Sequence, residues 1–153
     1  ASKQRVLDYI DLGVSEGAEL VIDGRSATVP DQGFFVGPTL FDGVNSDMKI
    51  ATEEIFGPVL CLQSVDSLDE ALAITKAQPL ANANSIFTTS GKSARQFRYE
   101  IDASMAGVNI GVAAPMSFFS FGGAKGSFFG DLKAHGREAF DFYTDRKVLI
   151  SRW

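Results

Sequence analysis

Apolar positions at the start of the chain follow a helical spacing and then a strand-like one. Between Val6 and Val14 they recur every three to four residues, which predicts a helix over residues 2–17. Shorter apolar runs at 18–24 and 33–44 lie between turn-forming Gly, Pro and Asp residues, and they predict short strands. The first third of the chain therefore combines one helix with strands.

A regular alternation of strands and helices follows. The run 58–65 is mostly apolar and predicts a buried parallel strand. In the predicted helix 67–78, Ser67 and Glu70 have the spacing of a capping box. Further segments predict a strand at 84–89, a helix at 90–101 and a strand at 106–112. This order implies right-handed crossovers, and hence an α/β fold with a mainly parallel sheet and flanking helices.

The last residues, 140–153, predict one long strand with Val148 and Ile150 on the same side. No later segment could pair with such a strand, so it would form a sheet edge that invites a partner chain. The Phe-rich stretches at 117–123 and 126–132 also need a surface to pack against. Together with a start at Ala1 rather than Met, these features suggest a piece of a larger protein.

Composition narrows the functional classes. The net charge of −5 and the lack of a basic block argue against nucleic-acid binding. No apolar run has the length of a membrane span. The single cysteine excludes an internal disulfide, so the reducing cytoplasm is the expected compartment.

Three candidate sites fail on their spacing or setting. Gly91-Lys92-Ser93 is not a phosphate-binding loop, because the position that needs glycine is Ile86; Ser90 is instead expected to cap a helix. Cys61 lies within a predicted strand and is interpreted as a core residue. His135 is the only histidine and has no second ligand, so we expect a surface loop and no metal site.

Two further stretches are ambiguous from the residues alone. Residues 121–131 contain several glycines and Lys125, which could cradle an anion or reflect tight backbone packing; both alternatives stay open. Glu53 and Glu54 form a charged pair that ordinarily lies in water. A carboxylate can, however, accept hydrogen bonds from both hydroxyls of a ribose, and Phe56 could lie against a flat heterocycle.

The stretch "EEIFGPVL" at 53–60 resembles the aldehyde dehydrogenases, as do "GFFVGPTL" at 33–40, "GVNIG" around Asn109 and "FGG" at 121–123. The resemblance covers essentially the whole chain in the right order. It implies that Glu54 binds the nicotinamide ribose of NAD, that Phe56 flanks the nicotinamide ring, and that Phe121 lines the aldehyde tunnel. Glu53 is expected to be structural.

Within that family, "KGSFFGD" and the closing "SRW" resemble the acylating branch, which acts on malonate or methylmalonate semialdehyde. That branch uses NAD, releases carbon dioxide and passes the acyl group to coenzyme A as co-substrate, in valine or inositol breakdown. A hydrolytic, NAD(P)-dependent branch is the alternative, and a non-catalytic assembly module is a second. A small phosphate-binding domain is the weakest reading.

The resemblance also implies that the nucleophilic cysteine lies upstream of the matching region, since Cys61 follows the Glu motif instead of preceding it. We therefore expect residues 1–139 to be a carboxyl-terminal part of the catalytic domain, inactive alone because it lacks a thiolate. Residues 140–153 are expected to be an oligomerisation strand that builds a homodimer or homotetramer.

Overall fold

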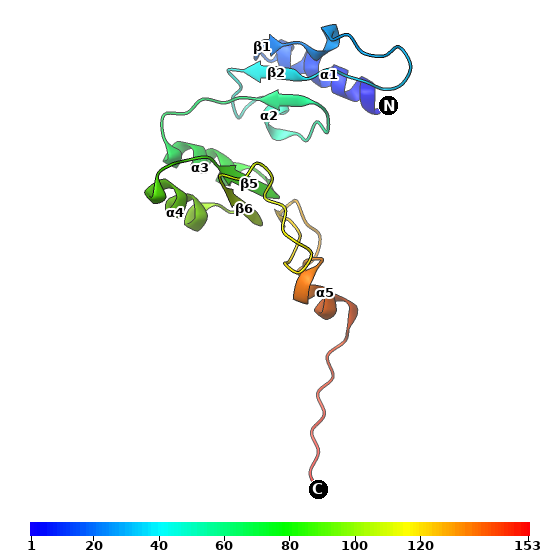
Figure 1. Cartoon of the computed structure of the whole chain (residues 1–153), viewed down its shortest axis with the longest axis vertical. Helices are drawn as coiled ribbons and strands as arrows, with labels where there is room; N and C mark the ends of the chain where they lie inside the picture. The colour runs from blue at the N-terminus through cyan, green and yellow to red at the C-terminus, as the bar shows by residue number, and fades with distance from the viewer. The chain divides into compact units, whose positions relative to one another are not determined.

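The computed structural model describes residues 1–153, which form two compact units, Ala1–Asp66 and Ser67–Trp153 (Figure 1). Helices alternate with short strands in both units, which confirms the predicted α/β class. The strands form three small sheets in place of one, and two of the four strand pairings are parallel. The order of elements was predictable, but it did not determine which strands pair.

The first unit is a three-stranded sheet with two helices. Its elements are α1 (Ser2–Ser15), β1 (Glu19–Ile22), the 3₁₀ turn η1 (Gly24–Ser26), β2 (Thr39–Asp42), α2 (Lys49–Thr52) and β3 (Val59–Cys61). β2 lies in the centre, antiparallel to β1 and parallel to β3. The predicted parallel strand therefore exists, but it is shorter than 58–65. It is also not buried, since Leu60 in its middle is 60% exposed.

The core of the first unit lies between α1 and the sheet. Phe41 and Ile10 are fully buried at its centre. Helix α1 turns Val6, Ile10 and Gly13 inward, whereas Val14, which the spacing had placed on this face, is 46% exposed. Gly13 replaces it because a Cβ atom there would lie 2.8 Å from the ring of Phe41.

Helix α2 depends on α1 for its start. Its N-cap residue, Met48, has no side chain that can cap the free backbone N–H groups. The carboxylate of Glu16, just after α1, accepts hydrogen bonds from the N–H of Lys49 at 2.9 Å and of Ile50 at 3.4 Å. A negative charge at this end also suits the helix dipole. This contact places the loop that follows α2.

The second unit has three helices and two pairs of strands. Its elements are α3 (Leu68–Ala77), β4 (Leu80–Ala81), β5 (Ala83–Ile86), α4 (Gly91–Glu100), β6 (Met105–Val108), β7 (Ala124–Lys125) and α5 (Gly136–Tyr143). β5 and β6 are parallel, as predicted, and β4 pairs antiparallel with β7. The Oγ atoms of Ser67 and Ser90 accept hydrogen bonds from the N–H groups of Glu70 and Ser93, both at 3.2 Å. Both predicted helix caps are confirmed.

The end of the chain differs from its prediction. Residues 140–143 belong to α5, because the apolar positions of this stretch also fit a helical repeat once Gly136 has begun the helix. The predicted domain boundary between 139 and 140 thus lies inside a helix. Residues 144–153 have no regular secondary structure, and Val148 and Ile150 are exposed. Their pairing in an oligomer stays a prediction.

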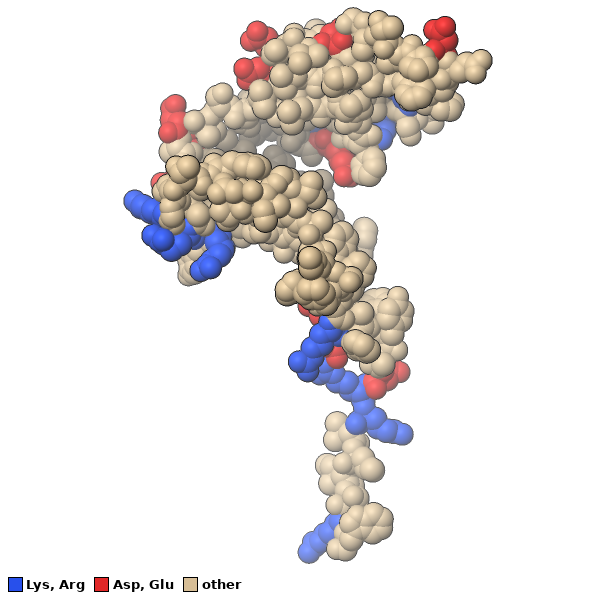
Figure 2. Space-filling view, viewed as in Figure 1, with Lys and Arg blue, Asp and Glu red and all other residues tan.

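Charge is distributed unevenly between the units. The first has 11 Asp or Glu and four Lys or Arg, whereas the second has eight and ten. In Figure 2, basic side chains gather over α4.

None of the helices has the length and apolar character needed to cross a membrane.

Candidate functional site

The loop between α2 and β3 presents the first pair of predicted site residues. Ile55 is buried in the core of the first unit and fixes the loop, while Glu54 and Phe56 on either side of it are exposed. Gly57 lies against α1, where a Cβ atom would come within 2.5 Å of Val6 Cγ2. The loop therefore packs on the helix through a glycine. The C=O of the following Pro58 accepts a hydrogen bond from the sheet at 2.8 Å.

The backbone at Phe56 adopts an unusual conformation. Its φ is +56°, in the left-handed region that bulky L-residues avoid. Such a conformation costs about 1–3 kcal/mol and persists only where the surroundings enforce it. Here Ile55 on one side and Gly57 on the other hold the backbone, and the Phe56 side chain stays 78% exposed. The fold thus stabilises an aromatic ring in water at an energetic cost, which is typical of a binding site.

The two adjacent carboxylates have different surroundings. Glu53 Oε2 accepts a hydrogen bond from the Tyr9 hydroxyl of α1 at 2.5 Å. This bond is the main reason that the pKa of Tyr9 is raised. Glu54 makes no hydrogen bond or ion pair within the chain. The bond from Tyr9 supports the prediction that Glu53 is structural, whereas the Glu54 carboxylate has no partner within this chain.

This arrangement fits the predicted nicotinamide nucleotide. The free Glu54 carboxylate has two acceptor oxygens, which match the two hydroxyls of a ribose. The exposed Phe56 ring lies two residues further on and offers an apolar face to a heterocycle. The two roles stay predictions.

Phe121 belongs to the second unit and is held by its backbone. Its N–H donates to the C=O of Ala134 at 2.8 Å, and the Ala134 N–H donates back at 3.1 Å. The ring is 40% exposed and its centroid lies 5.6 Å from that of His135. Its role in an aldehyde tunnel stays a prediction.

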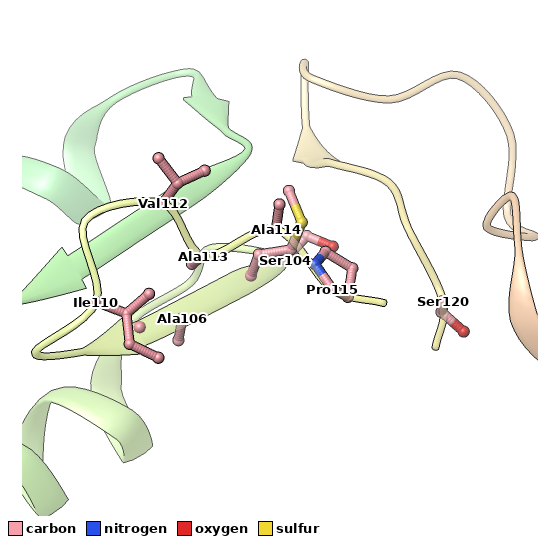
Figure 3. Close-up of a pocket in the computed structure, with 10 residues that line it drawn as sticks. Ser104, Ala106, Ile110, Val112, Ala113, Ala114, Pro115 and Ser120 are labelled. Atoms are coloured by element: carbon pink, nitrogen blue, oxygen red, sulfur yellow. The ribbon is translucent and has the colours of Figure 1, made fainter. Parts of the chain in front are cut away.

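A cavity of about 340 Å³ lies beside this segment, along β6 and the loop after it (Figure 3). Its walls are mostly small or apolar residues, with Ser120 at one side: Ser104, Met105, Ala106, Gly107, Ile110, Val112, Ala113, Ala114, Pro115 and Ser120. Phe121 is not among them. The sequence reasoning missed these residues, although the run of small apolar residues at 110–115 directly after Asn109 was a usable signal.

Asn109 fixes the start of the loop that follows β6. Its φ is +56°, which Asn tolerates better than most residues. Its Oδ1 accepts from the Thr88 N–H at 2.8 Å, and its Nδ2 donates to the Thr88 C=O at 3.1 Å. The side chain thus continues the pairing of β5 with β6 beyond the last strand residue, so the chain can turn back over β6.

The glycine-rich stretch 121–131 is explained by tight packing. A Cβ atom on Gly123 would lie 2.3 Å from the Ser127 carbonyl oxygen. Lys125 is engaged as well, because its Nζ donates to the C=O of Lys76 at 2.7 Å and of Gln78 at 3.3 Å, at the end of α3. Of the two alternatives from sequence, packing is therefore supported over an anion cradle.

Neither Cys61 nor His135 forms a reactive centre. Cys61 is half-buried, its thiol lies 3.6 Å from the Ile50 C=O as a donor, and burial raises its pKa. A reactive cysteine needs the opposite shift. His135 is exposed in the loop before α5, as predicted. No group of three or more His, Cys, Asp or Glu side chains is arranged to hold a metal ion.

Comparison with known proteins identifies the class. The aldehyde dehydrogenase family profile matches residues 1–149, and the chain belongs to this family. It is 53% identical over 154 residues to malonate-semialdehyde dehydrogenase 2 of Geobacillus kaustophilus, covering all of this chain and 32% of that protein. The chain thus spans about a third of the length of the curated relatives that it matches.

Solved structures agree with this assignment. A methylmalonate-semialdehyde dehydrogenase from Oceanimonas doudoroffii superposes with a TM-score of 0.96 and 43% identity, covering 99% of this chain and 32% of that one. A Mycobacterium tuberculosis aldehyde dehydrogenase complexed with NAD+ gives 0.87 and 36%, covering 95% and 29%. The fold and the resemblance seen in the sequence are confirmed.

Proposed function

We propose that this chain is part of an NAD-dependent dehydrogenase that oxidises malonate or methylmalonate semialdehyde and passes the acyl group to coenzyme A. Similarity to malonate-semialdehyde dehydrogenase along the whole chain supports the substrate class. The observation that carries the cofactor part is the contrast between Glu53, which is bonded to Tyr9, and the free Glu54 beside an outward-facing Phe56.

The residues of the first unit would hold the cofactor and take no part in bond making. The Glu54 carboxylate accepts hydrogen bonds from the two ribose hydroxyls, and the Phe56 ring limits where the nicotinamide lies. NAD supplies the acceptor for the hydride that leaves the substrate. Positioning of this kind lowers the barrier because the reacting atoms are held close together and aligned.

The thiolate that attacks the aldehyde has to come from outside these residues. Cys61 is the chain's only cysteine, and its raised pKa and its bond to the Ile50 C=O disqualify it. Acyl transfer to coenzyme A distinguishes this proposal from the hydrolytic alternative, in which water releases a free acid. The 153-residue chain alone should form no NADH.

The cofactor proposal is tested in the complete enzyme by Glu54→Gln, with NADH formation measured on malonate semialdehyde with and without coenzyme A. We expect the KM for NAD to rise about tenfold, since one charged hydrogen bond is weakened. Glu19→Gln is the matched control, because Glu19 is another exposed carboxylate of the first unit without a bonded partner. Unchanged kinetics at limiting NAD would refute the role of Glu54, and turnover that ignores coenzyme A would favour the hydrolytic branch.

We also propose that the enzyme acts in the cytoplasm as a homodimer or homotetramer joined through residues 140–153. The exposed Val148, Leu149, Ile150 and Trp153 support this proposal, because an apolar segment of this kind is stabilised by a partner surface. Removal of residues 144–153 from the complete enzyme should increase its elution volume on size exclusion. An unaltered elution volume would contradict the proposal.

A further inference from the structure

Glu138 in the first turn of α5 connects two segments that are distant in sequence. Its Oε1 accepts a hydrogen bond from the Ser120 hydroxyl at 2.8 Å, and its Oε2 accepts one from the Lys133 N–H at 2.6 Å. These bonds lower the pKa of Glu138, with the Lys133 N–H as the main cause. One carboxylate thus closes the loop 120–133 at both ends.

The helix that carries Glu138 is fixed at its start. Gly136 has a φ of +61°, and a Cβ atom there would lie 2.8 Å from the Phe118 carbonyl oxygen. The Gly136 N–H also donates to the C=O of Ser117 at 3.1 Å. The first turn of α5 therefore cannot move without disturbing 117–119, so the carboxylate is a rigid point of attachment.

The closed loop is braced from within as well. The Lys133 Nζ donates to the C=O of Gly123 and lies 4.3 Å from the centroid of the Phe128 ring. Together with the bonds between Phe121 and Ala134, these contacts hold the segment that carries Ser120. Ser120 lies at the side of the cavity along β6.

Ser120 lines one side of the cavity. Four of the nine other wall residues are Ala or Gly, and at these positions the backbone determines the space that is left. We propose that Glu138 is a positioning residue that holds Ser120 and thereby makes this cavity selective for a short aldehyde. The proposal rests on the proposed function, because it takes the cavity as the place of the aldehyde.

The test compares Glu138→Gln, Ser120→Ala and the double variant in the complete enzyme. The Gln amide has one acceptor oxygen in place of two and no negative charge. If it accepts from the Lys133 N–H, its own N–H has to donate to Ser120 Oγ, so the Ser120 bond is reversed and both bonds lose the charge that strengthens them. We expect the KM for malonate semialdehyde to rise about tenfold in Glu138→Gln, the scale of a charged hydrogen bond, with kcat little changed. The KM for a longer straight-chain aldehyde should rise less than the KM for malonate semialdehyde, so the selectivity for the short substrate falls.

Comparing the double variant with the two single variants tests whether Glu138 acts through Ser120. If Glu138 acts through Ser120, the double variant should lose no more selectivity than Glu138→Gln alone. Asp141→Asn is the matched control on the same helix, because Asp141 bonds only the exposed Arg146 side chain at 2.6 Å. It should leave selectivity unchanged. Independent, additive losses would overturn the proposed route through Ser120.

Hydrogen exchange on the complete enzyme tests the positioning without any measurement of activity. In Glu138→Gln, amides of residues 120–133 should exchange about tenfold faster, while those of β5 and β6 should not change. Unchanged exchange overturns the positioning role, and faster exchange with unchanged selectivity overturns the link to the cavity. If exchange rises as expected but the complete wild-type enzyme oxidises no aldehyde, then the proposed function fails while the positioning of Ser120 stands.

Discussion

The two units of this chain differ in the contacts that stabilise each of them internally. In the first, eight apolar residues form one continuous buried cluster: Val6, Ile10, Ala18, Phe41, Val44, Met48, Ile50 and Ile55. In the second, only Leu72, Ala81 and Phe97 are buried apolar side chains, while Gly107, Gly122 and Gly123 are buried as well. Glycine contacts and polar bonds replace a large core there.

This difference affects how each unit presents its candidate site. The loop between α2 and β3, which carries Glu54 and Phe56, is anchored by the core residue Ile55, so its geometry is as stable as the apolar cluster. In the second unit, the segment from Ser120 to Lys133 is held by a close backbone contact at Gly123 and by the carboxylate of Glu138. The first site should therefore be sensitive to loss of side-chain volume, and the second to added atoms or lost polar bonds.

The largest effect is expected from Phe41→Ala, which removes the fully buried ring at the centre of the first unit. Such truncations cost about 3–5 kcal/mol, from lost burial and the cavity left behind. Urea denaturation would measure the loss of stability, and residue-resolved hydrogen exchange of the folded protein would assign this loss to one unit or the other. Phe34→Ala, at an 87% exposed position of the same unit, is the control and should cost little. An equal loss of protection in both units would show that they do not differ as described.

A smaller effect of the opposite kind is expected from Gly123→Ala in the second unit. The new Cβ atom would meet the Ser127 carbonyl oxygen at 2.3 Å, and a backbone atom cannot move away cheaply. Overpacking of this kind costs about 1–3 kcal/mol. Gly111→Ala is the matched control, because nothing lies within 4 Å of a Cβ atom there. Thermal unfolding of the two variants should therefore differ, and equal midpoints would argue against glycine packing as the basis of this unit.

The sequence predicted the elements whose signals are local. The side chains of Ser67 and Ser90 cap their helices as their positions suggested, because capping involves only neighbouring residues. Helical spacing failed at Val14 because the choice of Gly13 depends on the ring of Phe41, which lies far along the chain. The strand predicted at 140–153 failed at 140–143 for a related reason: short apolar runs fit either repeat.

The candidate site residues also differ in whether their signal in the sequence is local. Glu54 and Phe56 were singled out by a motif, and the structure adds the free carboxylate and the left-handed backbone. The link from Glu138 to Ser120 could not be read from the sequence, because it joins residues 18 positions apart through a folded loop. Contacts of this kind become visible only when the backbone is placed.

The smallest expected effect concerns Tyr9 and Glu53, whose hydrogen bond attaches the loop between α2 and β3 to α1. The bond to Glu53 raises the pKa of Tyr9 in the folded chain. The bond therefore contributes its full stabilisation at pH values below the ordinary tyrosine pKa of about 10. This stabilisation is lost as the pH rises through the higher pKa of the folded chain. Tyr9→Phe lacks the bond at every pH. The wild type should therefore be the more stable of the two near neutral pH, and the difference should shrink above pH 10 (roughly the range where Tyr ionises) when urea midpoints are compared. If the difference in urea midpoint stays constant to the highest pH measured, the Tyr9–Glu53 bond does not anchor the loop. The structural role assigned to Glu53, and with it the contrast to Glu54, would then be wrong.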